Sequence, residues 1–182
     1  PAVIDLVDAD NFTLEVINSL VHGGKKLLTT DSSGKGLAEE ADVALHNNVF
    51  IGGNLFFEQS PQCGVVSQTQ LSLRNNVFVD VNLRLTLLQD QDLEASHNLL
   101  VDTSCRTCET VAGDECTHDA PRVALDFEDT EGTRHVGDAG FVDLDTKDPG
   151  ASDLTLAADS PAIDAGVPEW SDPDASRSDM GL

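Results

Sequence analysis

The chain has 182 residues, of which 33 are acidic and 10 are basic, and its formal net charge is −23. This balance argues strongly against nucleic acid as a partner, because phosphate groups are bound mainly by Lys and Arg, and it likewise disfavours anionic membrane surfaces. The length is that of one domain with an ample apolar core. The acidity fits two interpretations: charge that favours solubility, as in salty water, or the binding of divalent cations.

A short pattern recurs along the first hundred residues. Four segments align without gaps, with starts 29, 28 and 22 residues apart: 14–21, 43–50, 71–78 and 93–100. Each has a short strand with alternating apolar residues, a polar corner and a second short strand. Repeats of this period predict a stack of similar units, in which each unit buries its apolar side chains against the next.

The corner of the pattern is usually Asn. Ser19, Asn48, Asn76 and Asn98 share one column of the alignment. Because an Asn side chain both donates and accepts hydrogen bonds, we predict that the three asparagines stack in one ladder. The first residue of each aligned segment is apolar, and we predict that Val43, Leu71 and Leu93 at this position point inward.

Later segments extend the series. Residues 123–127 start 30 residues after Leu93, and residues 154–156 start 31 residues after Val123, which gives about six turns. Four apolar stretches between the aligned segments could supply a third side for each turn, although they do not align cleanly: 26–28, 54–57, 64–66 and 83–88.

The C-terminal motifs point to a family. Gly140-Phe-Val-Asp143, Ser160-Pro-Ala-Ile-Asp-Ala-Gly166 and the segment 172–181 resemble the closing segment of many secreted bacterial proteins with a pectin-lyase-like fold. The resemblance implies an all-β fold, a right-handed parallel β-helix (β-solenoid) of about six coils with a C-terminal capping segment. We expect coils over 1–137, with a Cys-containing loop at 103–120, and the last coil and cap over 138–182.

The resemblance implies an extracellular or cell-surface domain that engages extracellular polysaccharide. The family also contains lyases and hydrolases, so one alternative is an enzyme acting on polymers that contain uronic acid. The other is a noncatalytic solenoid used for adhesion or as a scaffold. Fold alone does not decide among these.

Candidate catalytic and substrate-binding residues lie in the outward columns of the pattern. His46 and Arg74 share one column and would be neighbours on adjacent coils; Glu15 and Glu94 share the parallel column. A lyase needs a base and a cation, which His46 and Arg74 could supply. The alternative is an ordinary solvated sheet face. Asp80 and Asp102 could be hydrolase carboxylates or turn residues.

The four cysteines are Cys63, Cys105, Cys108 and Cys116. With His118, the last three could form a Cys3His zinc site, whereas the extracellular setting that the resemblance implies favours disulfides. We expect Cys105 or Cys108 to pair with Cys116, and Cys63 to pair with the remaining one.

A candidate calcium loop lies near the C-terminus. Asp172, Asp174, Ser176 and Asp179 place oxygen ligands at nearly alternate positions. The alternative is a capping loop whose Asp side chains bond to its own backbone amides. No other cofactor is expected.

The two ends carry a further expectation. The chain starts at Pro1 without Met, so we expect an upstream portion to have been removed. Residues 1–7 have the character of a coil already under way, whose exposed backbone groups need a partner. That partner would be the upstream β-helix portion, a second chain or another copy. The segment from Gly140 onward should cover the other end.

Overall fold

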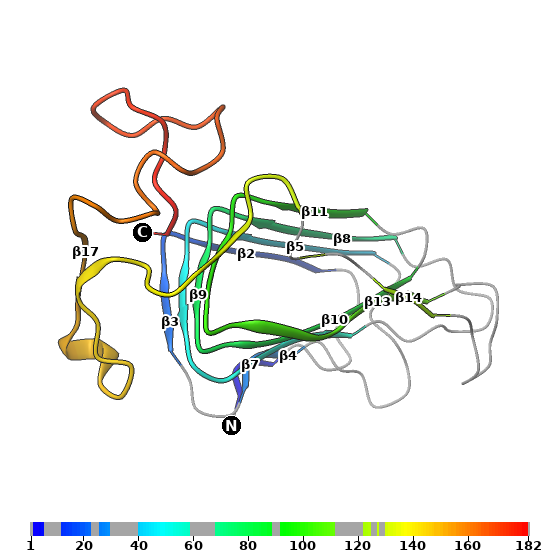
Figure 1. The fold of residues 1–182 in the computed structure, drawn as a ribbon. Helices are drawn as coiled ribbons and strands as arrows, with labels where there is room; N and C mark the ends of the chain where they lie inside the picture. Colours follow the sequence, from blue (N-terminus) through cyan, green and yellow to red (C-terminus); the bar gives the residue numbers. More distant parts are fainter. Residues whose placement is uncertain are drawn as a thin grey trace.

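The computed structural model describes residues 2–5, 12–22, 26–29, 40–58, 68–88, 92–111, 122–124, 127 and 130–181. Within these ranges the regular structure is β-strand, apart from one short 3-10 turn, η1 (Pro149–Ala151). Figure 1 shows the strands stacked in layers, with the C-terminal segment beside them. The all-β prediction is therefore confirmed.

Most strands belong to three sheets, named A, B and C. Sheet A contains, in spatial order, β1 (Ala2–Asp5), β4 (Lys26–Thr29), β7 (Asn54–Glu58), β10 (Asn82–Leu88), β13 (Ser104–Val111) and β14 (Arg122–Ala124). Sheet B contains β2 (Phe12–Ile17), β5 (Glu40–His46), β8 (Gln68–Arg74) and β11 (Asp92–Ser96). Sheet C contains β3 (Leu20–His22), β6 (Val49–Ile51), β9 (Val77–Val79), β12 (Leu99–Val101) and β15 (Arg134–Val136).

From β1 to β13 the chain visits sheets A, B and C in turn, again and again. Neighbouring strands in this run are parallel. Since each strand pairs with the strand one circuit later, every circuit lies on the previous one. This arrangement is consistent with a β-helix. It also confirms that the apolar stretches at 26–28, 54–57 and 83–88 form a third side, whereas the stretch at 64–66 lies outside the described residues.

The register of sheet B matches the sequence alignment residue by residue. Leu14 pairs with Val43, Val43 with Leu71, and Leu71 with Leu93. Val43 and Leu71 are buried, and Leu93 is partly buried against the same apolar cluster. The predicted inward column is therefore confirmed.

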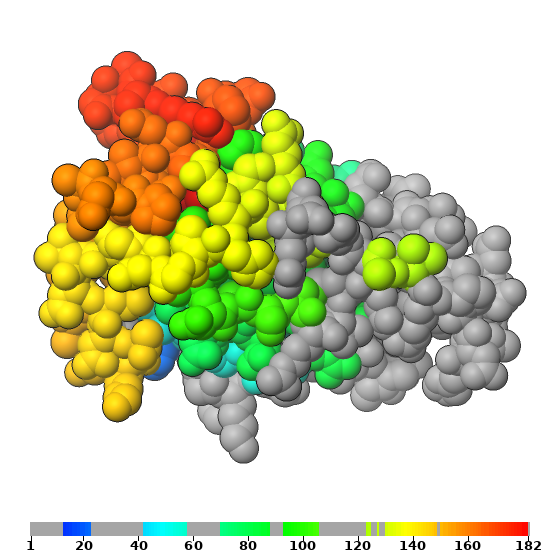
Figure 2. All heavy atoms as spheres, in the orientation of Figure 1, coloured from blue at the N-terminus to red at the C-terminus, as the bar shows by residue number. Residues whose placement is uncertain are grey.

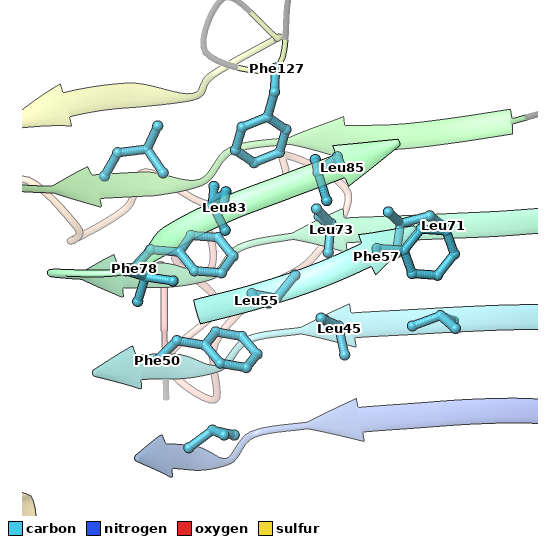
Figure 3. Close-up of a cluster of buried hydrophobic side chains, with 14 of the residues drawn as sticks. Leu45, Phe50, Leu55, Phe57, Leu71, Leu73, Phe78, Leu83, Leu85 and Phe127 are labelled. Atoms are coloured by element: carbon cyan, nitrogen blue, oxygen red, sulfur yellow. The ribbon is translucent and has the colours of Figure 1, made fainter. Parts of the chain in front are cut away.

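The core lies between the three sheets. Each sheet contributes apolar side chains to it, and Figure 3 shows Leu45 and Leu73 from sheet B, Phe50 and Phe78 from sheet C and Leu55 from sheet A meeting there. The rings of Phe50 and Phe78 stack with centroids 5.1 Å apart and planes inclined by 10°. Like residues thus pack on like residues from one circuit to the next.

The asparagine ladder is present as predicted. Nδ2 of Asn48 donates to Oδ1 of Asn76, and Nδ2 of Asn76 donates to Oδ1 of Asn98, both at 3.1 Å. The three amides also donate to backbone oxygens of sheet B, namely those of Val16, Leu45 and Leu73. All three asparagines are fully buried, so these bonds satisfy polar groups that water cannot reach.

Two corners of each circuit use left-handed backbone. At the corner between sheets B and C, φ is 49° at Asn18, 54° at Asn47, 57° at Asn75 and 53° at His97. At the corner after sheet C, Gly52 has φ 65°, and the equivalent Asp80 and Asp102 have 53° and 46°. The structure therefore supports the turn interpretation of the two aspartates, because Asp and Asn adopt this conformation more readily than most residues.

The last two predicted coil segments are not where the repeat places them. Val123 lies in β14, which pairs antiparallel with β13 in sheet A, and the Val123 side chain is exposed. Leu154 lies in β17 (Asp153–Leu156), which pairs antiparallel with β16 (Phe141–Asp143) as a separate hairpin. The prediction that these segments continue the parallel stack is wrong, and the count of about six coils loses the support it drew from them.

Beyond β14, Phe127 contributes to the core and β15 joins sheet C. Phe127 is fully buried in the core cluster, beside Leu83 and Leu85 in Figure 3. Oγ1 of Thr133 then accepts a hydrogen bond from the Asn98 backbone N–H at 3.3 Å, and β15 pairs with β12. Thr133 thus takes the next position in the ladder.

Residues 138–181 pack against the side of the stack. The outward side chains of sheet C are apolar, and they form a second buried cluster with Ala139, Ala162, Ala165 and Met180. Figure 1 shows this segment running alongside sheet C, and Figure 2 shows its yellow to red atoms as a continuous layer against the green ones. Residues 138–181 therefore form a flank-covering segment, and the expectation that they cover one end stays a prediction.

At the other end of the stack, β1, β2 and β3 are the edge strands of their sheets. The structure confirms that residues 2–5 form a strand of the stack, because β1 pairs with β4. What pairs with this edge stays a prediction.

Candidate functional site

The outward face of sheet B carries the candidate site. Because side chains alternate along a strand, columns of outward side chains run across β2, β5, β8 and β11, and two of these columns contain the candidate residues. One column contains Glu15, Ala44, Ser72 and Glu94, and the other contains Ile17, His46, Arg74 and Ser96. The predicted neighbourhood of His46 and Arg74 is confirmed, and so is the shared column of Glu15 and Glu94.

His46 has two neighbours of different character. Its Nε2 lies 2.7 Å from Oγ of Ser72, which sits on the adjacent strand. Its ring also contacts Trp170 of the C-terminal segment, with centroids 5.4 Å apart and planes inclined by 57°. The indole therefore forms a wall at one side of the outward face, and His46 is half-buried rather than open to solvent.

Arg74 is held by Glu94. Nη2 of Arg74 and Oε2 of Glu94 are 2.7 Å apart, and 32% of the Arg74 side chain and 59% of the Glu94 side chain are exposed. At this exposure the pair contributes little to stability, but it fixes the position of the guanidinium. Nε of Arg74 is shielded from solvent and has no hydrogen-bond partner within the described residues.

The environment keeps His46 neutral. Burial lowers the pKa of His46 below its usual 6.5, and the positive charge of Arg74 lowers it further. Glu15 and Glu94 act in the opposite direction but do not reverse the shift. At pH 7 the ring is therefore uncharged, and one of its nitrogens can accept a proton.

An acidic cleft adjoins this face. It has a volume of about 730 Å³ and lies between the corner asparagines Asn18 and Asn47 and the C-terminal loop that follows Trp170. Its remaining lining is Ser171, Asp172, Pro173, Asp174, Ser178, Asp179 and Gly181. The cleft offers short oxygen and amide groups, and the charges that line it are negative.

The predicted calcium residues lie together, but carboxylates among them already accept hydrogen bonds from backbone N–H groups of their own loop. Asp172, Asp174, Ser176 and Asp179 line one hollow of about 420 Å³. Oδ2 of Asp172 accepts from the backbone N–H of Asp179 at 3.2 Å, and Oδ1 of Asp174 accepts from Ser176 N–H at 2.9 Å.

This bonding is what the capping-loop alternative expects. In the described ranges, no three His, Cys, Asp or Glu side chains are arranged to hold a metal ion. Burial and the neighbouring Asp179 raise the pKa of Asp172, which a bound cation would offset. Calcium binding stays a prediction.

Of the cysteines, the structure describes the side chain of Cys105 alone, and that sulfur is disulfide-bonded. A bonded sulfur does not serve as a zinc thiolate, so Cys105 does not belong to a Cys3His site. The side chains of Cys63, Cys108 and Cys116 lie outside the described part of the chain, as does His118, and the predicted pairing stays a prediction.

Comparison with known proteins adds no relative. No protein-family model matches the chain, and neither a curated protein nor a solved structure shows significant similarity to it. No helix in the described ranges has the length and apolar character that crossing a membrane would require. Function must therefore be argued from the site itself.

Two members of the site are absent from the sequence prediction. Ser72 lies in the Glu15 column, and its place diagonal to His46 follows from the alignment once the strands are set in register. Trp170 comes from a segment with no repeat, and nothing in the sequence indicates which part of the stack it contacts.

Proposed function

We propose that the chain is an extracellular or cell-surface domain that binds polysaccharide through the outward face of sheet B, next to Trp170. We further propose that the stack is a right-handed parallel β-helix of the pectin-lyase-like kind. The cycle of three parallel sheets and the asparagine ladder support the second proposal. The contact between Trp170 and His46 carries the first.

A sugar ring has one apolar face of C–H groups and a rim of hydroxyls. An indole offers a flat apolar surface for the first, and charged and amide groups offer hydrogen bonds to the second. The outward face of sheet B places Trp170 beside the polar groups of His46, Ser72 and Arg74. This combination suits an elongated, hydroxyl-rich ligand laid across the strands.

The charges favour a neutral polysaccharide over a uronate. Arg74, the basic residue of the two described columns, is already paired with Glu94, and His46 is uncharged at neutral pH. Asp172, Asp174 and Asp179 make the adjoining cleft negative. A lyase needs a cation to neutralise the substrate carboxylate, so the enzyme acting on uronic-acid polymers is the weaker alternative.

The test is retention in native gels that contain dissolved polysaccharide, using a panel of neutral and uronate polymers. We expect a neutral polymer to slow the protein, and Trp170→Ala to lose about tenfold in affinity, because one well-placed aromatic contact is worth about 1.4 kcal/mol. Val142→Ala removes an exposed apolar side chain from β16 and is the control.

The same panel separates the alternatives. Release of an unsaturated product from a uronate polymer, read by its absorbance, would establish the lyase. Retention by uronate polymers only when calcium is present would indicate that calcium bound by the Asp172 loop bridges the protein and the polymer. No retention by any polymer would contradict the proposed function and favour a scaffold.

A further inference from the structure

We propose that Ser72 and His46 form a nucleophile and general-base pair that cleaves small acyl esters, such as acyl groups carried on the hydroxyls of a polysaccharide. The acyl-ester chemistry rests on the Ser72–His46 geometry alone. The choice of a polysaccharide as the carrier rests on the proposed function.

The first observation is the hydrogen bond itself. A serine hydroxyl becomes a nucleophile when a base within hydrogen-bond reach can take its proton, and Nε2 of His46 is 2.7 Å from Oγ of Ser72. The two residues are on adjacent strands, β5 and β8, whose pairing fixes their backbones. Catalytic pairs held by regular structure keep their geometry better than pairs held by loops.

The second observation is the protonation state of the base. His46 must be neutral to accept a proton, and its burial and the charge of Arg74 both favour the neutral ring. Once the proton arrives, Glu15 and Glu94 favour the resulting imidazolium. These two carboxylates thus act on His46 from a distance, in the electrostatic role that the acid of a catalytic triad has.

The third observation concerns space and charge around Ser72. In its column Ser72 lies between Ala44 on one strand and Glu94 on the other, and the short side chain of Ala44 is the side on which we place the acyl group. Arg74 lies two residues further along β8 on the same face, and its guanidinium is held by Glu94. Nη2 of Arg74 is engaged by Glu94, so the donor that we assign to the oxyanion formed when the carbonyl is attacked is its Nε–H, which has no hydrogen-bond partner within the described residues.

The reaction balances without a cofactor. Oγ of Ser72 attacks the carbonyl carbon while its proton moves to Nε2 of His46. The tetrahedral intermediate collapses, His46 gives the proton to the departing alcohol, and an acyl-serine remains. A water molecule, deprotonated by His46, then attacks the acyl-serine, releases the acid and restores the serine hydroxyl.

The experiment treats the full chain with a fluorophosphonate, which phosphonylates activated serines, and locates the adduct by mass spectrometry. We expect labelling at Ser72, loss of that label in Ser72→Ala, and a rate at least about 100-fold lower in His46→Gln, since a general base contributes that much or more. Ser104→Ala is the control, because Ser104 is exposed but lies on sheet A.

Hydrolysis of p-nitrophenyl acetate supplies a second readout. Its rate should fall in Ser72→Ala and His46→Gln and stay unchanged in Ser104→Ala. The labelling of Ser72 is measured on the wild-type chain, so this test does not depend on whether a variant folds. Absence of any adduct at Ser72, or equal labelling of Ser72 and Ser104, would overturn it.

These results are independent of polysaccharide retention. Labelling at Ser72 without retention would reject the polysaccharide as carrier and leave the esterase pair standing. Retention without labelling would leave the proposed binding function standing and reject the pair.

Discussion

Asn76 donates its side-chain amide to Oδ1 of Asn98 at 3.1 Å, although the two residues belong to different circuits of the chain. Asn76 also accepts from the side chain and the backbone N–H of Asn48. One buried side chain therefore joins three circuits. The ladder ties the turns of the stack together at the corner where sheets B and C meet.

Replacing the middle residue of the ladder should be costly. Asn76→Ala leaves the Leu45 carbonyl and groups of Asn48 and Asn98 buried without their partners, at about 1–3 kcal/mol for each unsatisfied group. We expect the free energy of unfolding to fall by about 3 kcal/mol or more in urea denaturation.

Ser19→Ala is the matched control, because Ser19 occupies the same column at the end of the ladder and its hydroxyl bond to the Ile17 carbonyl is exposed. We expect a loss of less than about 1 kcal/mol there. Equal losses of unfolding free energy in the two variants would contradict the stabilising role of the ladder.

Substitutions at three glycines distinguish the stability cost of backbone strain from that of steric crowding. Gly52 has φ 65° and open space where a Cβ would go, so Gly52→Ala should cost about 1 kcal/mol of backbone strain. Gly132 has φ 68°, and its Cβ would come within 2.7 Å of the His97 ring, so Gly132→Ala should cost about 1–3 kcal/mol more.

Gly137→Ala meets nothing within 4 Å and should change stability by less than about 0.5 kcal/mol. Thermal unfolding of the three variants gives the order directly. A Gly132→Ala variant as stable as Gly52→Ala would show that the His97 ring does not pack against the backbone at Gly132.

The flank-covering segment has its own test. A Cβ at Gly166 would lie 2.6 Å from both Nδ2 of Asn75 and the carbonyl oxygen of Ser178, which leaves no room for Ala. Asn75 also accepts from the backbone N–H groups of Val167 and Gly181, both at 2.7 Å. We expect Gly166→Ala to detach this part of the segment and speed amide exchange at Val167 and Gly181.

The core strands should keep their protection in that variant, because the core cluster between the sheets does not include Gly166. Gly150→Ala is the control, since its nearest neighbour is an oxygen of Asp148 at 3.6 Å. If Gly166→Ala exchanges like the wild type, the segment is not anchored at Asn75.

Two histidines should make stability depend on pH. Burial is the main cause that lowers the pKa of both His46 and His97; Arg74 adds to it at His46 and Arg177 at His97. Glu15 and Glu94 oppose the shift at His46; at His97, Glu131 and Glu169 oppose it and Arg134 adds to it.

Because the folded pKa lies below the unfolded value of 6.5, the unfolded chain takes up protons first as the pH falls. Stability should therefore be constant above about pH 7 and decline between 6.5 and the lower folded pKa values. His97→Asn keeps a residue suited to positive φ, as at Asn75, and should shrink this decline. A decline that His97→Asn and His46→Gln leave unchanged would contradict the assignment.

Much of the stack could be predicted from the sequence because its determinants are local and repeated. The columns of Leu14, Val43 and Leu71 follow from strand alternation, and the ladder follows from one recurring residue type. The flank-covering segment had a sequence signal that the prediction did not use. β6, β9 and β12 read Val-Phe-Ile, Val-Phe-Val and Leu-Leu-Val, which is apolar on both faces and indicates a sheet covered on both sides.

Other parts could not be predicted for physical reasons. The alternating apolar residues Val123, Leu125 and Phe127 do not determine whether a strand pairs parallel or antiparallel, and here β14 pairs antiparallel with β13. The contact between His46 and Trp170 joins segments far apart in the chain, and no periodicity relates them. The site residues within the repeat could thus be predicted from the sequence, whereas the position of Trp170 beside them could not.

Trp170 is the single tryptophan of the chain, which has no tyrosine, so its fluorescence reports on this site without interference. Titration of the wild-type chain with oligosaccharides cut from the neutral polymers of the panel tests the central claim most directly. A ligand stacked on the indole should shift its emission in a saturable way, with half-saturation at the concentration that gives half-maximal retention in gels. Retention of the protein by a polymer whose oligosaccharides leave the emission of Trp170 unchanged would place binding elsewhere and contradict the account.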